Sequence, residues 1–217
     1  KFDYHFHGWH DAVVGARSPE DENPHSSGVP AATLSNTISV PQGDIGLVDD
    51  KLASGDVAAV ILEPTGASWG TLPLPSSFLA ELREVTRKHN TVLIFDEVVT
   101  GFRVSPGGTQ GRYGITPDLT SLAKILAGGM PGGAVCGRAD IVSMIEFRDG
   151  RWNAEKRIMH PGTFNANPVS AAAGSTMLAM VKTGEHHKHA DALNERLIAG
   201  LNATLEAANA PGAAYGL

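Results

Sequence analysis

The hydrophobic positions along the chain predict a series of buried strands. A strand covered on both faces reads as a continuous apolar run, whereas a half-exposed strand alternates apolar and polar residues. Four short runs bounded by turn residues are of the first kind: residues 57–62, 91–95, 134–137 and, more weakly, 34–40. We therefore expect the α/β class, with a mostly parallel sheet flanked by helices.

The residues between the two strongest runs have helical spacing. Within residues 75–89, apolar side chains stand at positions 78, 79, 82 and 85, and Ser76 or Ser77 could cap the first turn. Residues 57–96 therefore predict a strand–helix–strand unit. Two parallel strands need a crossover of this kind, which is usually right-handed.

Three more helices are predicted towards the C-terminus, at residues 138–147, 169–181 and 187–209. The second is apolar around most of its circumference, so we expect it to be well buried, whereas the third is amphipathic. Long loops inside a compact domain are usually functional or covered by a partner. Three stretches are long enough for this expectation: residues 15–31, 102–117 and 148–164.

Composition and charge narrow the class of protein. A hydrophobic content of 42% with 18% charged residues describes a folded globular chain. The net charge is −6 without a basic block, which disfavours a nucleic-acid partner. No apolar run reaches the ~20 residues of a membrane helix, and no signal peptide opens the chain. Cys136 is the single cysteine, so no intrachain disulfide can form, and we expect a cytoplasmic protein.

Both ends of the sequence read as interruptions in a longer chain. An aromatic cluster begins at once, without a methionine, and the sequence stops soon after the Pro211-Gly212 turn, where another element would be expected. We therefore expect an internal piece of a longer protein. A mature, processed chain is the alternative.

Acidic residues follow the two strongest strands. Glu63 comes directly after the first, and Asp96 and Glu97 follow the second, at the edge where open α/β sheets bind ligands. Because Asp96 emerges from an apolar run, its carboxylate requires a cationic partner or several hydrogen-bond donors. A protonated pyridine nitrogen or a metal ion would serve, but the chain lacks the phosphate loop that accompanies many strand-end metals. The histidines also show no convincing metal-ligand spacing, and three of them are expected to be solvated: His186, His187 and His189.

Lys124 stands at the end of an apolar segment, directly before a glycine-rich turn. Lysine is rarely buried without a partner, and Asp118 is the one candidate nearby in the sequence. The lysine alone leaves two interpretations open. Its stem could lie along a strand end with the ammonium in water, or its amine, when desolvated, could form a Schiff base.

Six short segments spread over nearly the whole chain form a constellation: FHG at 6–8, EPTGA at 63–67, IFDEVVTGFR at 94–103, TPDLTSLAK at 116–124, GGMPGGA at 128–134 and HPGTFNANP at 160–168. Together they resemble the class III aminotransferases, which are fold-type I enzymes that use pyridoxal 5′-phosphate. The spacing also matches the family, since Lys124 lies 28 residues after Asp96. The second and fifth segments look most like the glutamate-1-semialdehyde 2,1-aminomutase branch and its aminotransferase neighbours.

This resemblance implies roles for individual residues. Lys124 would form a Schiff base with the cofactor aldehyde and then move a proton between substrate and cofactor. Asp96 would keep the pyridine nitrogen protonated, which makes the ring an electron sink. Phe6 would stack on the ring, His7 would support its loop, and Val98 would pack on the other face. Phe6 could instead belong to the core, and His7 could be purely structural.

Other positions carry further implications. Thr163 matches a threonine that reaches the cofactor phosphate of the neighbouring subunit, which implies a homodimer with shared active sites. Many relatives have a glutamine where Val99 stands, so Ser68 is the candidate for a polar contact to the cofactor. Glu63 could lie near the substrate or could only hold a turn.

The resemblance also implies the domain organisation and the reaction. Residues 1–181 would be part of the large cofactor-binding domain, and residues 182–217 a helix that leads into a C-terminal small domain. An amino group would pass between a small-molecule donor and a keto acid or aldehyde, or move within one molecule as in the aminomutase; racemisation uses the same lysine. The alternatives from other classes are a cofactor-free lysine Schiff-base lyase and a non-catalytic binding module. Since the family's phosphate loop would precede Lys1, these 217 residues alone are expected to bind cofactor weakly.

Overall fold

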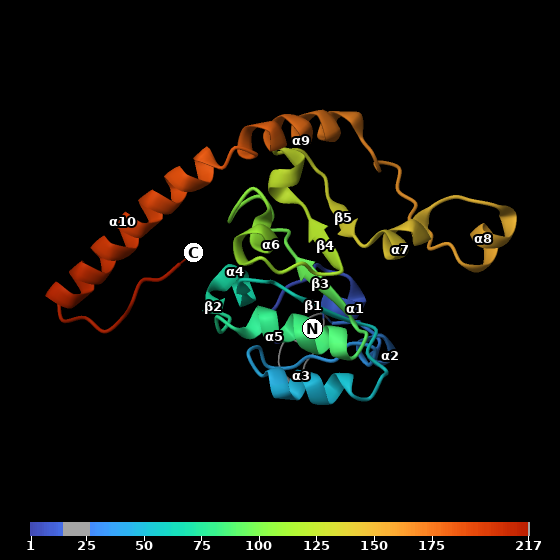
Figure 1. Ribbon diagram of the computed structural model, residues 1–217, viewed down its shortest axis with the longest axis horizontal. Coiled ribbons are helices and arrows are strands. Elements are labelled where there is room, and N and C mark those ends of the chain that lie inside the picture. Colours follow the sequence, from blue (N-terminus) through green and yellow to red (C-terminus); the bar gives the residue numbers. More distant parts are fainter. Residues whose placement is uncertain (15–26, 217) are drawn as a thin grey trace.

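The computed structural model has a four-stranded sheet at its centre, in the order β1-β3-β4-β5 (Figure 1). β1 (Ala59–Leu62), β3 (Val92–Asp96) and β4 (Leu119–Leu122) run parallel, and β5 (Ala134–Gly137) pairs antiparallel with β4. The mostly parallel sheet expected from the hydrophobic pattern is confirmed. Three of the four predicted strands are present, and β4 was not predicted.

The structure describes residues 1–14 and 27–216, so most of the loop expected at 15–31 lies outside the described residues. The other elements are α1 (Asp11–Val14), α2 (Ala31–Leu34), α3 (Ile45–Leu52), α4 (Ala67–Gly70), β2 (Leu72–Pro73), α5 (Phe78–Lys88), α6 (Gly108–Tyr113), η1 (Lys124–Ala127), α7 (Ala139–Val142), η2 (Ser143–Ile145), α8 (Gly150–Glu155), α9 (Pro168–Val181) and α10 (Glu185–Ala207). The helices predicted at 138–147 and 187–209 correspond to α7 with η2 and to α10. The two other long loops contain α6 and α8.

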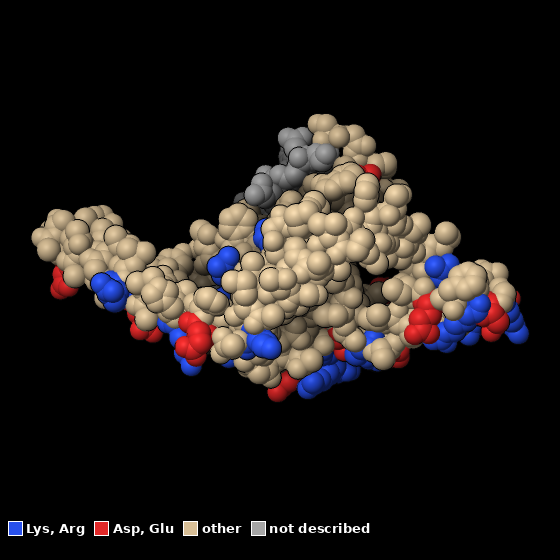
Figure 2. All heavy atoms as spheres, turned by 90° about the horizontal axis from the view of Figure 1, so that it is seen from above, with Lys and Arg blue, Asp and Glu red and all other residues tan. Residues whose placement is uncertain are grey.

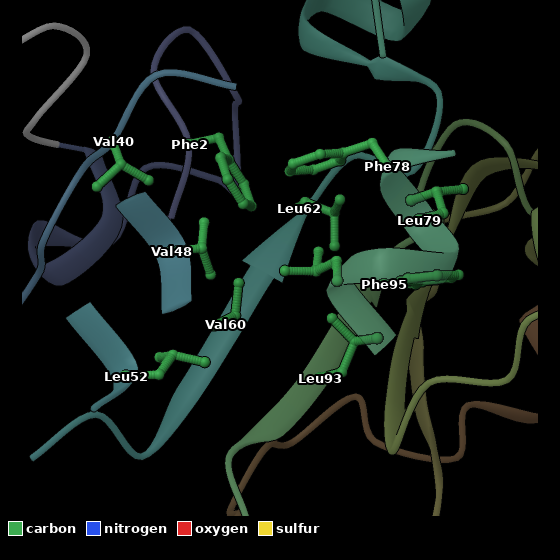
Figure 3. Packing of buried hydrophobic residues seen from close by; sticks show 11 residues of the cluster. Phe2, Val40, Val48, Leu52, Val60, Leu62, Phe78, Leu79, Leu93 and Phe95 are labelled. Atoms are coloured by element: carbon green, nitrogen blue, oxygen red, sulfur yellow. The ribbon is translucent and has the colours of Figure 1, made fainter. Parts of the chain in front are cut away.

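The core of the molecule lies on one side of β1 and β3, where α3 and α5 pack (Figure 3). Val60 and Leu62 of β1 and Leu93 and Phe95 of β3 point into it, because alternate residues of a strand share a face. The helices and the N-terminal segment contribute the other members: Phe2, Val40, Val48, Leu52, Phe78, Leu79 and Leu82. Burying each such side chain stabilises the fold by about 1.5–3 kcal/mol. This core fixes the two strands that carry Glu63 and Asp96 at their ends.

The helix α5 forms where the apolar spacing predicted it. Phe78, Leu79 and Leu82 are buried at helical spacing. Ser77 occupies the position before the helix, but its side chain makes no hydrogen bond to the first turn. The predicted capping role of this serine is therefore wrong.

Residues 34–40 do not form the predicted strand. The chain forms α2 up to Leu34, and only Val40 pairs, through a single parallel bridge with Phe2. The Ser35 hydroxyl donates a hydrogen bond to the carbonyl oxygen of Ala32 over 3.0 Å. Local bonds of this kind compete with a strand ladder, and they make this segment a turn.

The C-terminal helices lie apart from the core. α9 lies beyond β4 and β5, and α10 projects away from the body as an arm (Figure 1). Figure 2 shows this side of the molecule, with charged side chains gathered along one edge and on the projecting arms. Among the residues of α9 only Gly174 is buried, and α10 buries none. The predicted burial of residues 169–181 is therefore not achieved within the described chain, where α9 packs mainly on η1 and makes fewer contacts with α10.

Candidate active site

The carboxyl ends of three parallel strands lie at one edge of the sheet. Glu63 directly follows β1, Asp96 is the last residue of β3, and Lys124 comes two residues after β4. The register pairs Asp96 with Ser121 near the end of β4. The fold therefore brings together three candidate residues that are far apart in the sequence.

Asp96 is held by two groups and retains acceptor capacity for a third. His7 Nδ1 lies 2.7 Å from Asp96 Oδ2, and the Val98 amide donates to Oδ1 over 3.2 Å. Within residues 1–14 and 27–216, no lysine or arginine forms an ion pair with this carboxylate. An ionised carboxylate offers about four acceptor positions. The geometry therefore suits one further cationic donor, such as a protonated ring nitrogen.

Lys124 begins η1 with a left-handed backbone, at φ 48°. Its side chain is exposed, and its Nζ lies 5.8 Å from the centre of the Trp69 ring. Asp118 is not its partner, because that carboxylate pairs with Arg83 and Arg138. Among the residues that the structure describes, no carboxylate forms an ion pair with Lys124. The desolvation that we expected around it is not provided by the residues that the structure describes.

Glu63 connects two loops at this edge. The residue is 5% exposed. Its Oε1 accepts a hydrogen bond from the Phe6 amide (2.8 Å), and its Oε2 accepts one from the Trp69 amide (3.1 Å). Because both oxygens hold backbone, the geometry favours the turn-holding role of Glu63 over a place near the substrate.

His5 and Gln42 extend this support, and neither was among the expected site residues. His5 Nδ1 accepts from the Glu63 amide (2.8 Å), and its Nε2 lies 2.9 Å from Gln42 Oε1. Burial lowers the pKa of His5 to about 4, against an opposing effect of the Gln42 hydrogen bond. Gln42 also accepts from the Ala67 amide and donates to the Leu72 carbonyl oxygen. No local spacing could reveal these contacts, since His5 lies 37 residues from Gln42 and 58 from Glu63.

The remaining candidates differ in their surroundings. Phe6 is 67% exposed, which contradicts the alternative that it belongs to the core. Val98 is half-buried beside Asp96, and Ser68 is exposed in a left-handed turn at φ 51°. Thr163 is exposed on the loop before α9. In the described part of the chain, Thr163 makes no hydrogen bond or ion pair with the other candidates, whereas Asp96, His7 and Val98 are joined to one another.

Glu97 is a third buried acid at this edge, with an exposed fraction of 1%. Its carboxylate accepts hydrogen bonds from the Thr100 hydroxyl, the Thr109 amide and Gln110 Nε2 at 3.1, 2.6 and 3.0 Å. Gly108 has φ +62°, and a Cβ there would lie 2.4 Å from Glu97 Oε2. Glu97 therefore fixes the loop after β3, and both of its carboxylate oxygens accept hydrogen bonds from that loop.

The backbone of η1 packs directly on the backbone of α9. A Cβ at Gly128 would lie 2.5 Å from the carbonyl oxygen of Ala173, and a Cβ at Gly174 would lie 2.4 Å from that of Leu126. Both positions need glycine for this close approach. The turn that carries Lys124 is thus in backbone contact with α9.

His187 is not solvated as expected. Its Nε2 lies 2.9 Å from the Phe102 carbonyl oxygen, and its buried Nδ1 has no hydrogen-bond partner among the described residues. The start of α10 therefore packs against the loop after β3. Across the described ranges, no group of three or more His, Cys, Asp or Glu side chains could hold a metal ion. No helix in these ranges is long and apolar enough to cross a membrane.

The site combines an exposed lysine, an aspartate with spare acceptor capacity and an exposed aromatic ring. This set fits a flat cofactor that carries an aldehyde and a basic ring nitrogen. The sequence model of the class-III aminotransferase family matches residues 1–213 of the chain. The chain therefore belongs to the class-III aminotransferase family.

Two curated relatives illustrate the similarity. The glutamate-1-semialdehyde 2,1-aminomutase of Pyrobaculum neutrophilum is 41% identical over 206 residues, which cover 93% of this chain and 47% of the relative. The glutamate-1-semialdehyde 2,1-aminomutase 2 of Brevibacillus brevis is 41% identical over 208 residues, covering 93% and 46%. The chain thus spans about half the length of the curated relatives it matches.

Solved structures confirm the fold. An omega-transaminase from Sphaerobacter thermophilus superposes with a TM-score of 0.86 at 37% identity, over 99% of this chain and 50% of that one. A glutamate-1-semialdehyde aminomutase from Pseudomonas aeruginosa PAO1, in complex with PMP, gives a TM-score of 0.77 at 34% identity, over 94% and 46%. The fold is that of the large domain of the fold-type I transferases.

Proposed function

We propose that the protein containing this chain transfers amino groups with the aid of pyridoxal 5′-phosphate. The observation that carries the proposal is the position of Lys124 and Asp96 at one edge of the sheet, with no ion pair joining Asp96 to a lysine or arginine of the described residues. Two structural neighbours support the cofactor, one a transaminase with PLP bound and the other the aminomutase with PMP.

The cofactor, when bound, supplies an aldehyde that captures amines and a protonated ring that withdraws electrons from the substrate carbon. Lys124 would hold the cofactor through its amine. Once the substrate has displaced this amine, the amine would move a proton between the substrate carbon and the cofactor. Asp96 would bind the ring nitrogen. His7 and the Val98 amide already fix the orientation of this carboxylate.

We propose four further residues as contacts of the cofactor. Phe6 and Val98 would cover the two faces of the ring, and Ser68 would offer its hydroxyl to the cofactor. Thr163, which is exposed here, would reach the phosphate bound by a second copy, so the protein would be a homodimer with shared sites.

The proposed organisation follows from the same reasoning. Residues 1–181 would belong to the large domain, and residues 182–217 would lead to a C-terminal small domain. The protein would act in the cytoplasm on small molecules, without a nucleic-acid or membrane partner. These assignments stay predictions.

The curated relatives favour a second candidate reaction. Both are named glutamate-1-semialdehyde 2,1-aminomutases and are 41% identical to this chain. In that reaction the amino group moves within glutamate 1-semialdehyde and gives 5-aminolevulinate. Transfer between an amino donor and a keto acid or aldehyde is the first candidate, and racemisation would use the same lysine.

The cofactor can be tested on the full-length protein purified with pyridoxal 5′-phosphate. We expect a visible absorption band, and after borohydride treatment a mass increase on the peptide that contains Lys124. The Lys124→Ala variant should show neither. A colourless full-length protein would refute the proposal and would leave the cofactor-free lyase as the better candidate.

The reaction can then be identified with two substrate sets. One contains glutamate 1-semialdehyde without an acceptor, and the other contains simple amines with pyruvate. Product from the semialdehyde alone would identify the aminomutase, and alanine from pyruvate would identify the aminotransferase.

A further inference from the structure

The turn between β1 and β2 has an unusual backbone. Ser68 and Trp69 both adopt left-handed conformations, at φ 51° and φ 62°, between two glycines of positive φ, Gly66 and Gly70. A left-handed conformation costs a residue with a side chain about 1–2 kcal/mol, and it is rare for a bulky residue such as tryptophan. Strain of this kind persists only where the surroundings hold it, and it often marks a functional position.

Three sets of contacts hold this turn. The Trp69 amide donates to Glu63 Oε2 over 3.1 Å, and the Ala67 amide donates to Gln42 Oε1 over 3.1 Å. Gly66 and Ala67 form antiparallel bridges with β2. A Cβ on Gly66 would lie 2.1 Å from the carbonyl oxygen of Leu72. One of the two carboxylate oxygens of the buried Glu63 thus holds the backbone of Trp69 in place.

The strained turn directs a large apolar ring into the open. Trp69 is 65% exposed, although indole is among the side chains that gain most from burial. Its ring faces Lys124, with the Nζ 5.8 Å from the ring centre. At this distance the contact with the ammonium is weak, so attraction to the lysine alone does not account for the strained backbone.

We propose that Trp69 determines donor specificity by forming an apolar wall beside Lys124 for the side group of the amino donor. This inference rests on the proposed function, because the donor must react at Lys124. The wall favours a donor with a flat, apolar substituent, since such a group buries its surface against the indole. It gives no advantage to a donor whose substituent is as small as methyl.

The test compares two amines that differ in one substituent, 1-phenylethylamine and isopropylamine, with pyruvate as acceptor and the full-length holoenzyme. We expect the unmodified enzyme to have the higher kcat/KM for the phenyl amine. Trp69→Ala should lower that preference by about 10-fold or more, mainly through KM, because the lost contact acts in binding. Trp69→Phe should keep most of the preference, since it retains an aromatic face.

Trp152→Ala provides a matched control. The Trp152 indole stacks on Arg148, with the guanidinium carbon 4.1 Å from the ring centre, and it belongs to α8. This variant should leave the preference unchanged. An equal loss for both amines in Trp69→Ala would show a merely structural role and overturn the inference. So would an unchanged preference, or no turnover of either amine by the unmodified enzyme.

The visible cofactor band separates the two possible failures. If the band is present on Lys124 in every variant and the preference does not respond to Trp69, the inference about specificity is wrong and the proposed function stands. If the unmodified enzyme shows no band, the proposed function itself fails.

Discussion

Two aspartates at opposite edges of the sheet are equally buried and differently used. Asp96 ends β3, Asp118 precedes β4, and each side chain is 10% exposed. Asp118 accepts hydrogen bonds from the Leu93 amide and from the guanidinium groups of Arg83 and Arg138, at 2.8, 2.9 and 3.2 Å. Among the residues that the structure describes, Asp96 is bonded to one histidine and one amide. Burial alone therefore does not distinguish the two acids, whereas the number of positively charged partners does.

The electrostatics of Asp118 agree with a structural role. Burial would raise the pKa of its carboxyl, but the hydrogen bonds from Leu93, Arg83 and Arg138 outweigh burial and hold the pKa below its ordinary value. The ionised form is thus stabilised by the fold itself. Asp118 at the amino edge of the sheet thus stabilises the fold, whereas we propose that Asp96 at the carboxyl edge binds a ligand.

The largest expected effect at the carboxyl edge is that of Lys124→Ala. Removing the amine that transfers the proton should lower the rate of amino transfer by at least about 10²–10⁴-fold. The melting temperature of the cofactor-free protein should hardly change, because the side chain is exposed. Assays and thermal unfolding of the full-length protein measure both, with Lys182→Ala as a control on another exposed lysine. If the Lys124→Ala variant retained its activity, the proposed catalytic role of the carboxyl edge would be wrong.

Asp96→Asn should produce the next largest loss. The amide keeps the shape of the side chain but cannot hold a ring nitrogen protonated, so we expect the rate to fall by about 10²-fold or more. The cofactor should still attach to Lys124, which its absorption would show. Asp118→Asn is the matched control at the other edge. Equal rate losses in the two variants would contradict the division between the edges.

Asp118→Ala should act on stability instead. It leaves Arg83, whose side chain is 9% exposed, without its carboxylate. Removing one partner of such a pair costs about 3 kcal/mol. Urea unfolding should show this loss, whereas Asp140→Ala, which removes an exposed partner of Arg138, should cost far less stability because exposed ion pairs contribute little. Similar losses in the two variants would mean that the buried pair contributes no more than a surface pair.

The smallest expected effects are those of pH on the free energy of unfolding. His5, near the carboxyl edge, and Asp118, at the amino edge, should act in different pH ranges. Burial lowers the pKa of His5 from 6.5 to about 4, so the unfolded chain takes up the proton first. The free energy of unfolding should therefore fall between about pH 6.5 and pH 4. The contribution of Asp118 is complete above its unfolded pKa of 3.8 and is lost only as the pH falls through its lower folded value.

Unfolding across this pH range tests the separation. His5→Gln should flatten the decline between pH 6.5 and pH 4 relative to the unmodified protein, and Asp118→Asn should leave that part of the curve unchanged. If Asp118→Asn flattens it instead, the two ranges have been assigned to the wrong groups.

The sequence predicted those parts of the fold that depend on local pattern. The apolar runs of β1 and β3 and the helical spacing of α5 correspond to a core that lies within this chain. β4 was missed because two of its four residues, Thr120 and Ser121, are polar, so Leu119–Leu122 forms neither a continuous apolar run nor an alternating pattern. α9 was expected to be buried because of its composition, but composition does not say which part of a protein covers a helix.

The site was predictable only in part, for a similar reason. Lys124 and Asp96 could be found because strand ends and the family signature mark them. Gln42, His5 and Glu97 act through hydrogen bonds to distant backbone, and only the folded chain brings those partners together. Asp118 was considered as a partner for Lys124 because it is near in sequence, whereas the strand β4 places it at the opposite edge.

The glycine contacts between η1 and α9 have a mechanical consequence. Where Gly128 and Gly174 touch the opposite backbone, no side chain lies between the two segments to rotate and absorb a displacement. A small shift of α9 along or away from η1 would therefore be passed on, nearly undiminished, to the turn on which Lys124 stands.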